Sequence, residues 1–366
     1  MRVGIVSKWS ASGQAVVARQ IRSALDGRGH ETFVLARPGS GPRAQRSGPP
    51  DPVWDQPGVT QGSQHEIGGA EYLEWARSNR LDAVLLDENY QWAEIAGLRE
   101  LGVRTIGRFV WEYFGSESVE PARAAYDTIY SLHRAERDRY AEFGIESPYV
   151  QWGLHPELLA SAEAEDTAGR TGREAEDPTL IRFYFPGSYL GRRKPVRKVI
   201  RAFQRARGDH LRLLINAQVP RNDEALREAA AADPRIELML EDEPEAEHRR
   251  RFATCDVCLA PSRWEGLGLP LFEATAFGLP IITNDKPPMS ELVLDGRSGI
   301  LVPSERNGET RSGLPAWDPD VAALTAAIER LGDRAELERL APGVRELQVQ
   351  RDWRHTVAGL GALLAG

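Results

Sequence analysis

Two carboxylates, Glu265 and Glu273, flank a glycine-rich turn that follows an apolar strand and opens a helix. The glycines of this turn have no Cβ, so the backbone can approach a ligand closely, and Pro270 fits the first helical position, where a missing N–H costs nothing. The helix is therefore expected to begin at about Leu269. Its unpaired N–H groups can meet a diphosphate, while Glu273 can accept hydrogen bonds from ribose hydroxyls and Glu265 is left to meet a sugar.

The residues around this turn resemble the retaining glycosyltransferases of family 4, the group-1 type with the GT-B fold. That family has a Glu-x7-Glu signature with a Gly-x-Gly-x-Pro interior, followed by Glu-Ala, a Gly-Leu-Pro turn and a strand. The match here runs through 273–274, 278–280 and 281–283 and continues over 290–293 and 295–302. The alternative is a strand, a turn and a helix whose two glutamates are merely solvated. The resemblance implies that these residues bind a nucleotide-sugar donor: Gly266, Leu267, Gly268, Leu269 and Glu273.

A basic loop lies between an expected strand and the helix that follows it in the second half of the chain. Its cations Arg192, Arg193 and Lys194 can neutralise a diphosphate leaving group, which gathers charge as the glycosidic bond breaks. In the family an arginine precedes a lysine by five positions. Lys194 matches the lysine, but Tyr189 stands where the arginine is expected. We therefore expect Lys194, Glu265 and Arg193 to be the catalytic residues, with Arg192 as another arginine able to compensate.

The loop after the first expected strand resembles the family's first loop, where glycines let a helix N-terminus approach the phosphates and the acceptor. Only Gly13 remains of what is often a glycine pair. By this resemblance Gly13 lies on the donor side, and Lys8 and Trp9 line the acceptor side. The alternative is a tight strand-to-helix turn with Ser10 or Ser12 as the helix cap.

Trp111 and Glu112 follow a strand that ends near Phe109, at the level where many family members place a histidine close to the reacting sugar. Some relatives have Trp-Glu there instead, so both residues are expected on the acceptor side, with core packing as the alternative for Trp111. His133 also follows a strand and is expected to touch the acceptor. A histidine that starts a helix is the commoner case.

Retaining transfer in this family is pictured as attack on the same face from which the leaving group departs, and the departing phosphate oxygen takes the acceptor proton. Positioning and electrostatic stabilisation then supply most of the rate, and no protein nucleophile is essential. The nearest approach to an Asp-x-Asp metal motif, at 87–89, belongs to the other domain. The resemblance therefore implies a metal-independent enzyme without a cofactor, whose substrate is a nucleoside diphosphate sugar.

Composition is that of an ordinary soluble protein: 366 residues, 41% hydrophobic and 27% charged, long enough for two domains. No apolar run approaches the ~20 residues that cross a bilayer, and the first residues read as a strand, so a cytoplasmic protein is expected. The net charge of −8 argues against nucleic acid as a partner. Basic residues in 196–206 favour a solvated helix face over peripheral contact with an anionic membrane. Cys255 and Cys258 are expected to be buried structural thiols.

Alternating strand and helix patterns predict two Rossmann-like, doubly wound parallel-sheet domains facing an interdomain crevice, which is the α/β GT-B fold. Residues 1–155 are expected to form the acceptor-side domain, joined by a crossover helix at about 351–366. Residues 178–350 are expected to bind the nucleotide sugar, and 156–177 to be a solvated linker. The stretch 38–66, rich in turn-forming residues, is either an acceptor-side flap or plain disorder.

The leading hypothesis is a retaining glycosyltransferase that moves a sugar, hexosyl in type, from a nucleoside diphosphate to a small-molecule, glycan or lipid-linked acceptor. One alternative is a nucleotide-sugar-binding protein that has lost catalysis, as Tyr189 and the missing histidine suggest. Another is a sugar-nucleotide epimerase on the same fold. A dinucleotide oxidoreductase is disfavoured, because no Gly-x-Gly-x-x-Gly follows the first strand.

Overall fold

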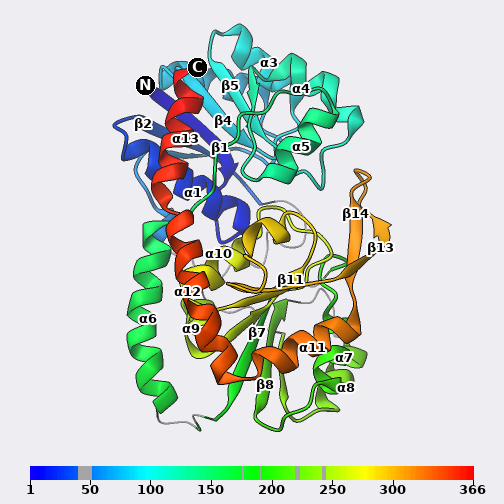
Figure 1. Ribbon diagram of the computed structural model, residues 1–366. Coiled ribbons are helices and arrows are strands. Elements are labelled where there is room, and N and C mark those ends of the chain that lie inside the picture. The colour runs from blue at the N-terminus through cyan, green and yellow to red at the C-terminus, as the bar shows by residue number, and fades with distance from the viewer. Residues whose placement is uncertain (40–51, 175–176, 178, 190, 219–222, 241–244) are drawn as a thin grey trace. The chain divides into compact units, whose positions relative to one another are not determined.

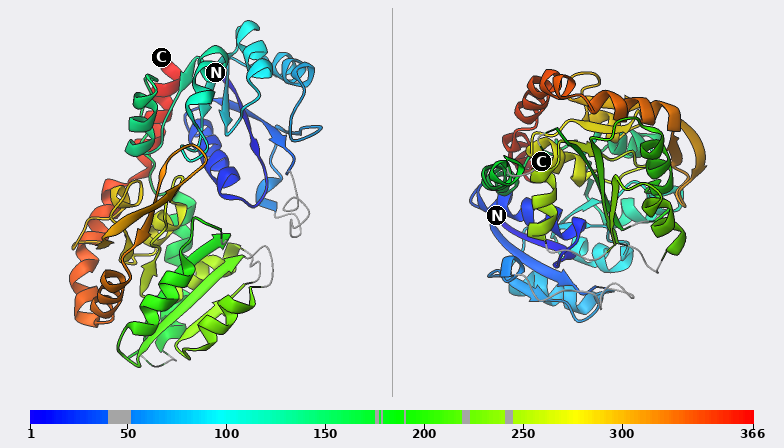
Figure 2. Two further views of the ribbon diagram at one scale, coloured as in Figure 1. Left: turned by 90° about the vertical axis from the view of Figure 1, so that its right-hand side faces the viewer. Right: turned by 90° about the horizontal axis from the view of Figure 1, so that it is seen from below.

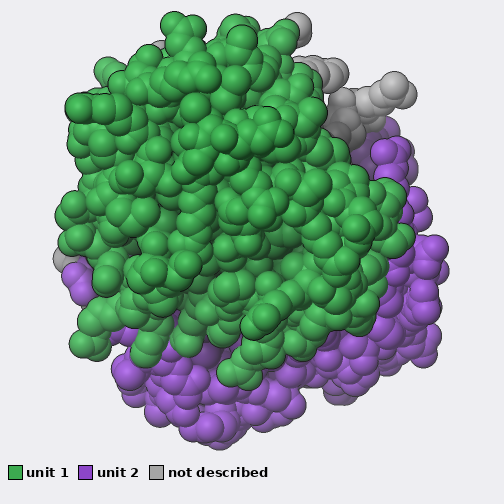
Figure 3. Space-filling view, turned by 90° about the horizontal axis from the view of Figure 1, so that it is seen from above, with its two compact units in different colours: residues 1–152, 354–366 green, residues 153–353 purple. Residues whose placement is uncertain are grey.

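The computed structural model divides into two compact units (Figure 1). Unit 1 comprises residues 1–152 and 354–366, and unit 2 comprises residues 153–353; Figure 3 colours them separately. Among the described residues, no helix is both long enough and apolar enough to span a membrane. The structure describes residues 1–39, 52–174, 177, 179–189, 191–218, 223–240 and 245–366.

Unit 1 is a parallel sheet with the strand order β3-β2-β1-β4-β5-β6. Its central strands are apolar along most of their length, as expected for a sheet that is covered on both faces. The strands are β1 (Arg2–Lys8), β2 (Glu31–Arg37), β3 (Val59–Gln61), β4 (Ala83–Asp87), β5 (Arg104–Arg108) and β6 (Thr128–Ile129). The strand order reverses between β1 and β4, so the loops that follow these two strands diverge at the carboxyl edge.

Helices cover both faces of this sheet, with α2, α3 and α4 on one face and α1 and α13 on the other (Figure 1). The last helix is tied to the unit by polar bonds: Thr356 Oγ1 donates to the carbonyl of Gln151 at 2.7 Å, and Arg104 donates to the carbonyl of Leu364 at 3.2 Å. The helices are α1 (Gly13–Asp26), α2 (Gly69–Ser78), α3 (Trp92–Glu100), α4 (Val119–Ala125), α5 (Arg134–Glu142) and α13 (Trp353–Ala365).

The stretch 38–66 contains regular structure in the part that is described. β3 adds to the edge of the sheet in register with β2, and Pro52–Trp54 form a 3-10 turn. The indole N–H of Trp9 donates to the carbonyl of Trp54 at 2.9 Å, and the two rings meet edge to face. Disorder does not describe residues 52–66, because they include an edge strand and a 3-10 turn, and the acceptor-side flap stays a prediction. Residues 40–51 lie outside the described residues.

Unit 2 is a second parallel sheet, with the strand order β12-β11-β10-β7-β8-β9. Helices α7, α8 and α11 pack on one face, and α9 and α10 lie on the other (Figures 1 and 2). The strands are β7 (Ile181–Tyr189), β8 (Leu211–Gln218), β9 (Ile236–Met239), β10 (Val257–Leu259), β11 (Ile281–Asn284) and β12 (Gly299–Val302), with the hairpin β13 (Ser304–Glu309) and β14 (Pro315–Pro319). The helices are α6 (Pro156–Glu174), α7 (Val196–Arg205), α8 (Glu224–Ala231), α9 (Glu245–Thr254), α10 (Leu269–Ala276), α11 (Val321–Leu331) and α12 (Arg334–Gln350).

The predicted linker 156–177 is largely a helix, which corrects that expectation. Pro156 occupies the first position of α6, and leucine, alanine and glutamate dominate the residues that follow. Helix α6 lies alongside α9, where Arg249 donates to Ser161 Oγ at 2.7 Å and Ala162 is buried. Intrinsic helix propensity and one packed face were enough to form the helix, although the segment lacks a regular apolar period.

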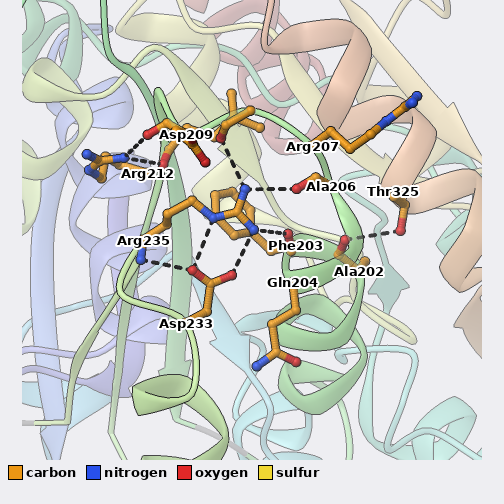
Figure 4. Close-up of polar contacts among 12 residues, drawn as sticks. Ala202, Phe203, Gln204, Ala206, Arg207, Asp209, Arg212, Asp233, Arg235 and Thr325 are labelled. Carbon is orange, nitrogen blue, oxygen red and sulfur yellow. Dashed lines mark hydrogen bonds and ion pairs between the residues drawn. The ribbon is translucent and has the colours of Figure 1, made fainter.

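The amino edge of the same sheet is held by Arg235, which precedes β9 (Figure 4). Its guanidinium lies over the Phe203 ring and donates to the carbonyls of Phe203, Ala206 and Gly208. Asp233 accepts the remaining side-chain donors at 2.8 and 3.0 Å. Every donor of this arginine is directed at the protein, so the cluster fastens the end of α7 to the start of β9.

Candidate functional site

The predicted donor turn has the backbone that its glycines require. Gly268 adopts φ 80°, and a Cβ there would lie 2.9 Å from Leu292 Cδ1, so both conformation and space favour glycine. Helix α10 begins at Leu269 with Pro270 in its first turn, which confirms the predicted start. Gly266, Leu267 and Gly268 are buried and Leu269 is partly exposed. The first N–H groups of α10 therefore point toward the carboxyl edge of the sheet.

Strand order brings the basic loop and this turn together. The order of unit 2 reverses between β7 and β10, which are neighbours in the sheet. The loop carrying Lys194 follows β7, and the turn carrying Glu265 follows β10. Ligands of doubly wound sheets bind where the loops diverge at such a reversal.

Lys194 and Glu265 form a buried ion pair at this point. Lys194 Nζ lies 2.5 Å from Glu265 Oε1 and donates to Ser262 Oγ at 2.8 Å, and Ser262 donates to the same carboxylate oxygen at 2.6 Å. Arg193 reaches Glu265 Oε2 at 3.3 Å. Lys194 is only 5% exposed and Glu265 only 3%, whereas the Arg193 side chain keeps 31%. Arg192, the other arginine of the loop, is exposed.

The charges of this cluster stabilise one another. Burial opposes ionisation of Glu265, but Arg193, Lys194 and two hydrogen bonds outweigh it and lower the pKa of Glu265 to about 2. Burial also lowers the pKa of Lys194, and the nearby Glu265 acts in the opposite direction. Among the described residues two cations thus face one carboxylate, an arrangement that suits an anionic ligand.

Glu265 lies in the loop before α10, as expected, and it has partners that the sequence did not indicate. Its side chain is buried and bonded to Lys194, Ser262 and Arg193, and its contact with a sugar stays a prediction. Lys194 and Glu265 meet because β7 pairs with β10, which places residues 71 positions apart in sequence side by side. Sequence spacing alone does not reveal this pairing. The side chain of Tyr189, which replaces the family's arginine, lies outside what the structure describes.

Glu273 lies on the first turns of α10 with its side chain partly exposed, and it has a partner that sequence reasoning missed. His248 Nε2 of α9 lies 3.2 Å from Glu273 Oε2, and its Nδ1 lies 2.9 Å from the hydroxyl of Tyr184 on β7. Nothing in the sequence near Glu273 indicates this histidine, because α9 and α10 are brought together only in the folded unit.

The residues predicted for the first loop of unit 1 are spread over different environments. Ser12 caps α1, its Oγ accepting from the N–H of Ala15 at 3.3 Å, as the alternative interpretation expected. Gly13 opens the helix and is exposed. Lys8 ends β1 with a partly exposed side chain, whereas Trp9 is buried against Trp54.

The other predicted acceptor-side residues gather near the end of β6. Trp111 is buried, and its ring meets that of His133 edge to face at 5.3 Å between centroids. His133 is the N-cap of α5, accepting from the N–H of Glu136 at 3.1 Å, so it is a histidine that starts a helix. Glu112 is buried next to Trp111 in sequence.

A buried ionic cluster at the carboxyl edge of unit 1 was not predicted. Arg108, which ends β5, lies 3.3 Å from Asp87 at the end of β4 and 3.2 Å from Glu136 of α5. Glu88, which follows Asp87 in the chain, has φ 51°, and its carboxyl accepts from the N–H of Val110. Burial and the neighbouring Asp87 raise the pKa of Glu88 to about 8. In the described part of the chain no group of three or more histidine, cysteine or acidic side chains is arranged to hold a metal ion.

The two cysteines are buried and unpaired with each other, and burial raises the pKa of the Cys258 thiol. A thiol with a raised pKa is a poor nucleophile and a poor metal ligand. Both observations agree with buried structural thiols.

Comparison with known proteins finds a family similar to most of unit 2. Residues 181–333 match the family described as Glycosyl transferases group 1. D-inositol 3-phosphate glycosyltransferase of Nocardia farcinica is 33% identical over 109 residues, which are 30% of this chain and 21% of that protein. Alpha-D-kanosaminyltransferase of Streptomyces kanamyceticus is 30% identical over 112 residues, 30% of this chain and 25% of that one. The chain thus matches about a quarter or less of the length of these relatives.

Solved structures share the fold over the whole chain. Sucrose-phosphate synthase from Thermosynechococcus elongatus superimposes with a TM-score of 0.69 at 17% identity, covering 100% of this chain and 98% of that one. Anabaena Alr3699/HepE, solved in complex with UDP and glucose, gives a TM-score of 0.68 at 12% identity, covering 100% and 98%. The chain therefore has the GT-B fold of two parallel-sheet α/β domains, and its residues 181–333 are similar to the glycosyl transferases of group 1.

Proposed function

We propose that this protein is a retaining, metal-independent glycosyltransferase that moves a sugar from a nucleoside diphosphate to an acceptor hydroxyl. The observation that carries this proposal is the cationic surplus of Arg193 and Lys194 around Glu265, beside the N-terminus of α10. Cations and unpaired N–H groups directed at one point are what a diphosphate requires. The family match of residues 181–333 supports the same function, as do the transferase names of the relatives.

Arg193 and Lys194 have a role in the reaction that follows from charge. As the bond between the anomeric carbon and the phosphate oxygen breaks, negative charge grows on the departing diphosphate, and fixed cations in a water-poor site stabilise it without rearranging. The acceptor oxygen bonds to the anomeric carbon from the same face. Its proton passes to the departing phosphate oxygen, so the step balances without a protein base. The two cations supply the positive charge that a divalent metal supplies in other transferases.

Glu265 is then a positioning residue for both cations. Its carboxylate fixes Lys194 Nζ and Arg193 NH1 at 2.5 and 3.3 Å and favours the charged form of the buried lysine. A diphosphate oxygen competes with this carboxylate for the same donors. Donor binding is thus expected to exchange one anionic partner of the cations for another.

Glu273 is proposed to bind the ribose of the donor, since it lies about one turn into α10 and its side chain is partly exposed. An ionised carboxylate that accepts from both vicinal hydroxyls distinguishes ribose from a deoxysugar. The acceptor is proposed to meet unit 1 near Lys8, Trp111, Glu112 and His133.

A panel of nucleoside diphosphate sugars tests the proposal. A ligand bound only by the folded protein raises its free energy of unfolding, by about 2.7 kcal/mol at a ligand concentration of 100 Kd, and so raises the melting temperature. The best donor is then incubated with the protein in EDTA, and mass spectrometry follows release of the nucleoside diphosphate. Slow hydrolysis or transfer is expected, and it excludes a protein that only binds. Conversion to an isomeric donor, without release, indicates an epimerase instead.

A further inference from the structure

His248 connects the core of unit 2 to the glutamate proposed to bind ribose. Its Nδ1 lies 2.9 Å from the hydroxyl of Tyr184, and its Nε2 lies 3.2 Å from Glu273 Oε2. We propose that His248 is a positioning residue that fixes the Glu273 carboxylate in the orientation that accepts the ribose hydroxyls of a donor. This inference rests on the proposed function, and it assigns to a residue of α9 part of the donor selectivity.

The hydrogen bonds along this path have one consistent direction. The carboxylate of Glu273 can only accept, so Nε2 of His248 carries the hydrogen in the neutral ring and Nδ1 is the acceptor. The hydroxyl of Tyr184 can donate to Nδ1, because Asn216 Nδ2 donates to that hydroxyl oxygen at 3.4 Å. Asn216, Tyr184, His248 and Glu273 thus form a chain of four groups, each donating toward the carboxylate.

The chain is anchored at one end and accessible at the other. Asn216 and Tyr184 are buried on the neighbouring strands β8 and β7, and Phe252 packs edge to face on both Tyr184 and His248. The side chains of His248 and Glu273 keep 29% and 26% of their exposure. A ligand can therefore reach the carboxylate, while the groups that orient it are fixed by the sheet.

Orientation matters because a glutamate has three side-chain torsions to fix before it can accept two hydroxyls at once. A carboxylate held in place before the ligand arrives loses less freedom on binding, worth about three- to tenfold in affinity for one immobilised side chain. The contribution of His248 should therefore depend on the hydroxyls of the sugar that Glu273 accepts, and should vanish for a nucleotide that lacks them.

Isothermal calorimetry tests whether the contribution of His248 depends on the ribose hydroxyls. The two ligands are UDP and 2′,3′-dideoxy-UDP, or the matching pair of another base if the panel of donors selects it. We expect the wild-type protein to prefer the ribose form by about tenfold or more, since charge-assisted hydrogen bonds are at stake. His248→Ala should lose most of this preference, leaving about twofold. His248→Gln retains an N–H donor near the position of Nε2 and should restore much of it. His210→Ala is the matched control, since His210 contacts the carbonyl of Gly332 at the other edge of the sheet.

The outcomes separate the inference from the function on which it rests. If folded His248→Ala keeps the full ribose preference, or loses affinity for both nucleotides equally, His248 does not position Glu273 and the inference is overturned, while the proposed function stands. If the wild-type protein binds no nucleoside diphosphate, the proposed function is itself wrong and the inference falls with it. Should His248→Ala fail to fold, Tyr184→Phe removes only the hydroxyl that orients the ring. An unchanged ribose preference in Tyr184→Phe, beside a lost preference in Glu273→Gln, then overturns the inference.

Discussion

The carboxyl edges of the two sheets carry ionic clusters of different composition. In unit 2, Lys194 and Arg193 face the single carboxylate of Glu265. In unit 1, Arg108 lies between Asp87 and Glu136, with Glu88 next in the chain. Two sheets of similar topology therefore carry different arrangements of charge at their carboxyl edges, where doubly wound sheets bind ligands. The difference teaches that the fold supplies the place for a ligand, and that a few charged residues decide the chemistry of that place.

The largest expected effect is on stability, in unit 1. Arg108→Leu leaves Asp87 and Glu136 buried without their cation, and removing one partner of a buried ion pair costs about 3–5 kcal/mol. Chemical denaturation of the variant beside the wild type measures this. Arg137→Leu, whose ion pair with Asp138 is exposed, is the matched control and should change stability little. An equal loss in both variants would show that the cluster is not the cause.

Turnover is expected to depend most on Lys194. Lys194→Ala removes a cation from the departing phosphate, and loss of one such electrostatic group lowers kcat by about 10²–10³-fold. Lys198→Ala is the control, since Lys198 pairs with Asp318 on a more exposed surface of the same unit. Rates at saturating donor check this. A rise in KM with unchanged kcat would mean that Lys194 only docks the donor.

Donor affinity should fall by a smaller amount in Glu273→Gln. Replacing the charged acceptor weakens two hydrogen bonds to ribose, which is expected to cost about 1–3 kcal/mol of nucleotide binding. Calorimetry with the nucleotide of the best donor measures the change. Glu329→Gln serves as a control from the same unit, since Glu329 pairs with the exposed Arg207, and unchanged affinity in Glu273→Gln would remove the ribose role.

The two units should also respond to pH in opposite directions, which sharpens the comparison. The pKa of Glu265 is lowered to about 2, so its contribution is present above the unfolded pKa of about 4.5 and is lost as pH falls toward 2. The pKa of Glu88 is raised to about 8, so its contribution is present below about 4.5 and is lost as pH rises to 8. Each of these groups changes the free energy of unfolding by at most ~1.4 kcal/mol per pH unit.

Unfolding followed from pH 3 to 9 in the wild type, Glu265→Gln and Glu88→Gln measures these contributions. Glu88→Gln should flatten the decline of stability between pH 4.5 and 8, and Glu265→Gln should flatten the decline below 4.5. If Glu88→Gln leaves the stability above pH 4.5 unchanged, the pKa of Glu88 is not raised by folding and its carboxyl is ionised at neutral pH.

Local features of the site could be predicted from the sequence. The start of α10 at Leu269 follows from Pro270 and from Gly268, because both act within one turn of backbone. The parallel sheets follow from alternating apolar strands and helices. These features depend on residues that are close in sequence, where helix or strand propensity and the spacing of apolar residues decide the structure.

Features that depend on strand pairing could not be predicted. The bond between Lys194 and Glu265 requires β7 beside β10, and the path from Tyr184 through His248 to Glu273 requires β7, α9 and α10 to meet. The cluster of Arg108 likewise joins the ends of β4 and β5 to α5. Helix α6 was missed for another reason: its residues favour a helix individually, while the period that signals a packed face is weak.

The last helix carries a consequence for how the molecule is made. Residues 354–366 belong to unit 1, although 201 residues of unit 2 separate them from residue 152. Val150 and Gln151 meet this helix at Gly359 and Thr356. During synthesis the first sheet therefore lacks one of its helices until residues 354–366 have emerged from the ribosome. A protein fragment that ends at residue 152 would lack this helix, so the face of the sheet that the helix covers would stay exposed.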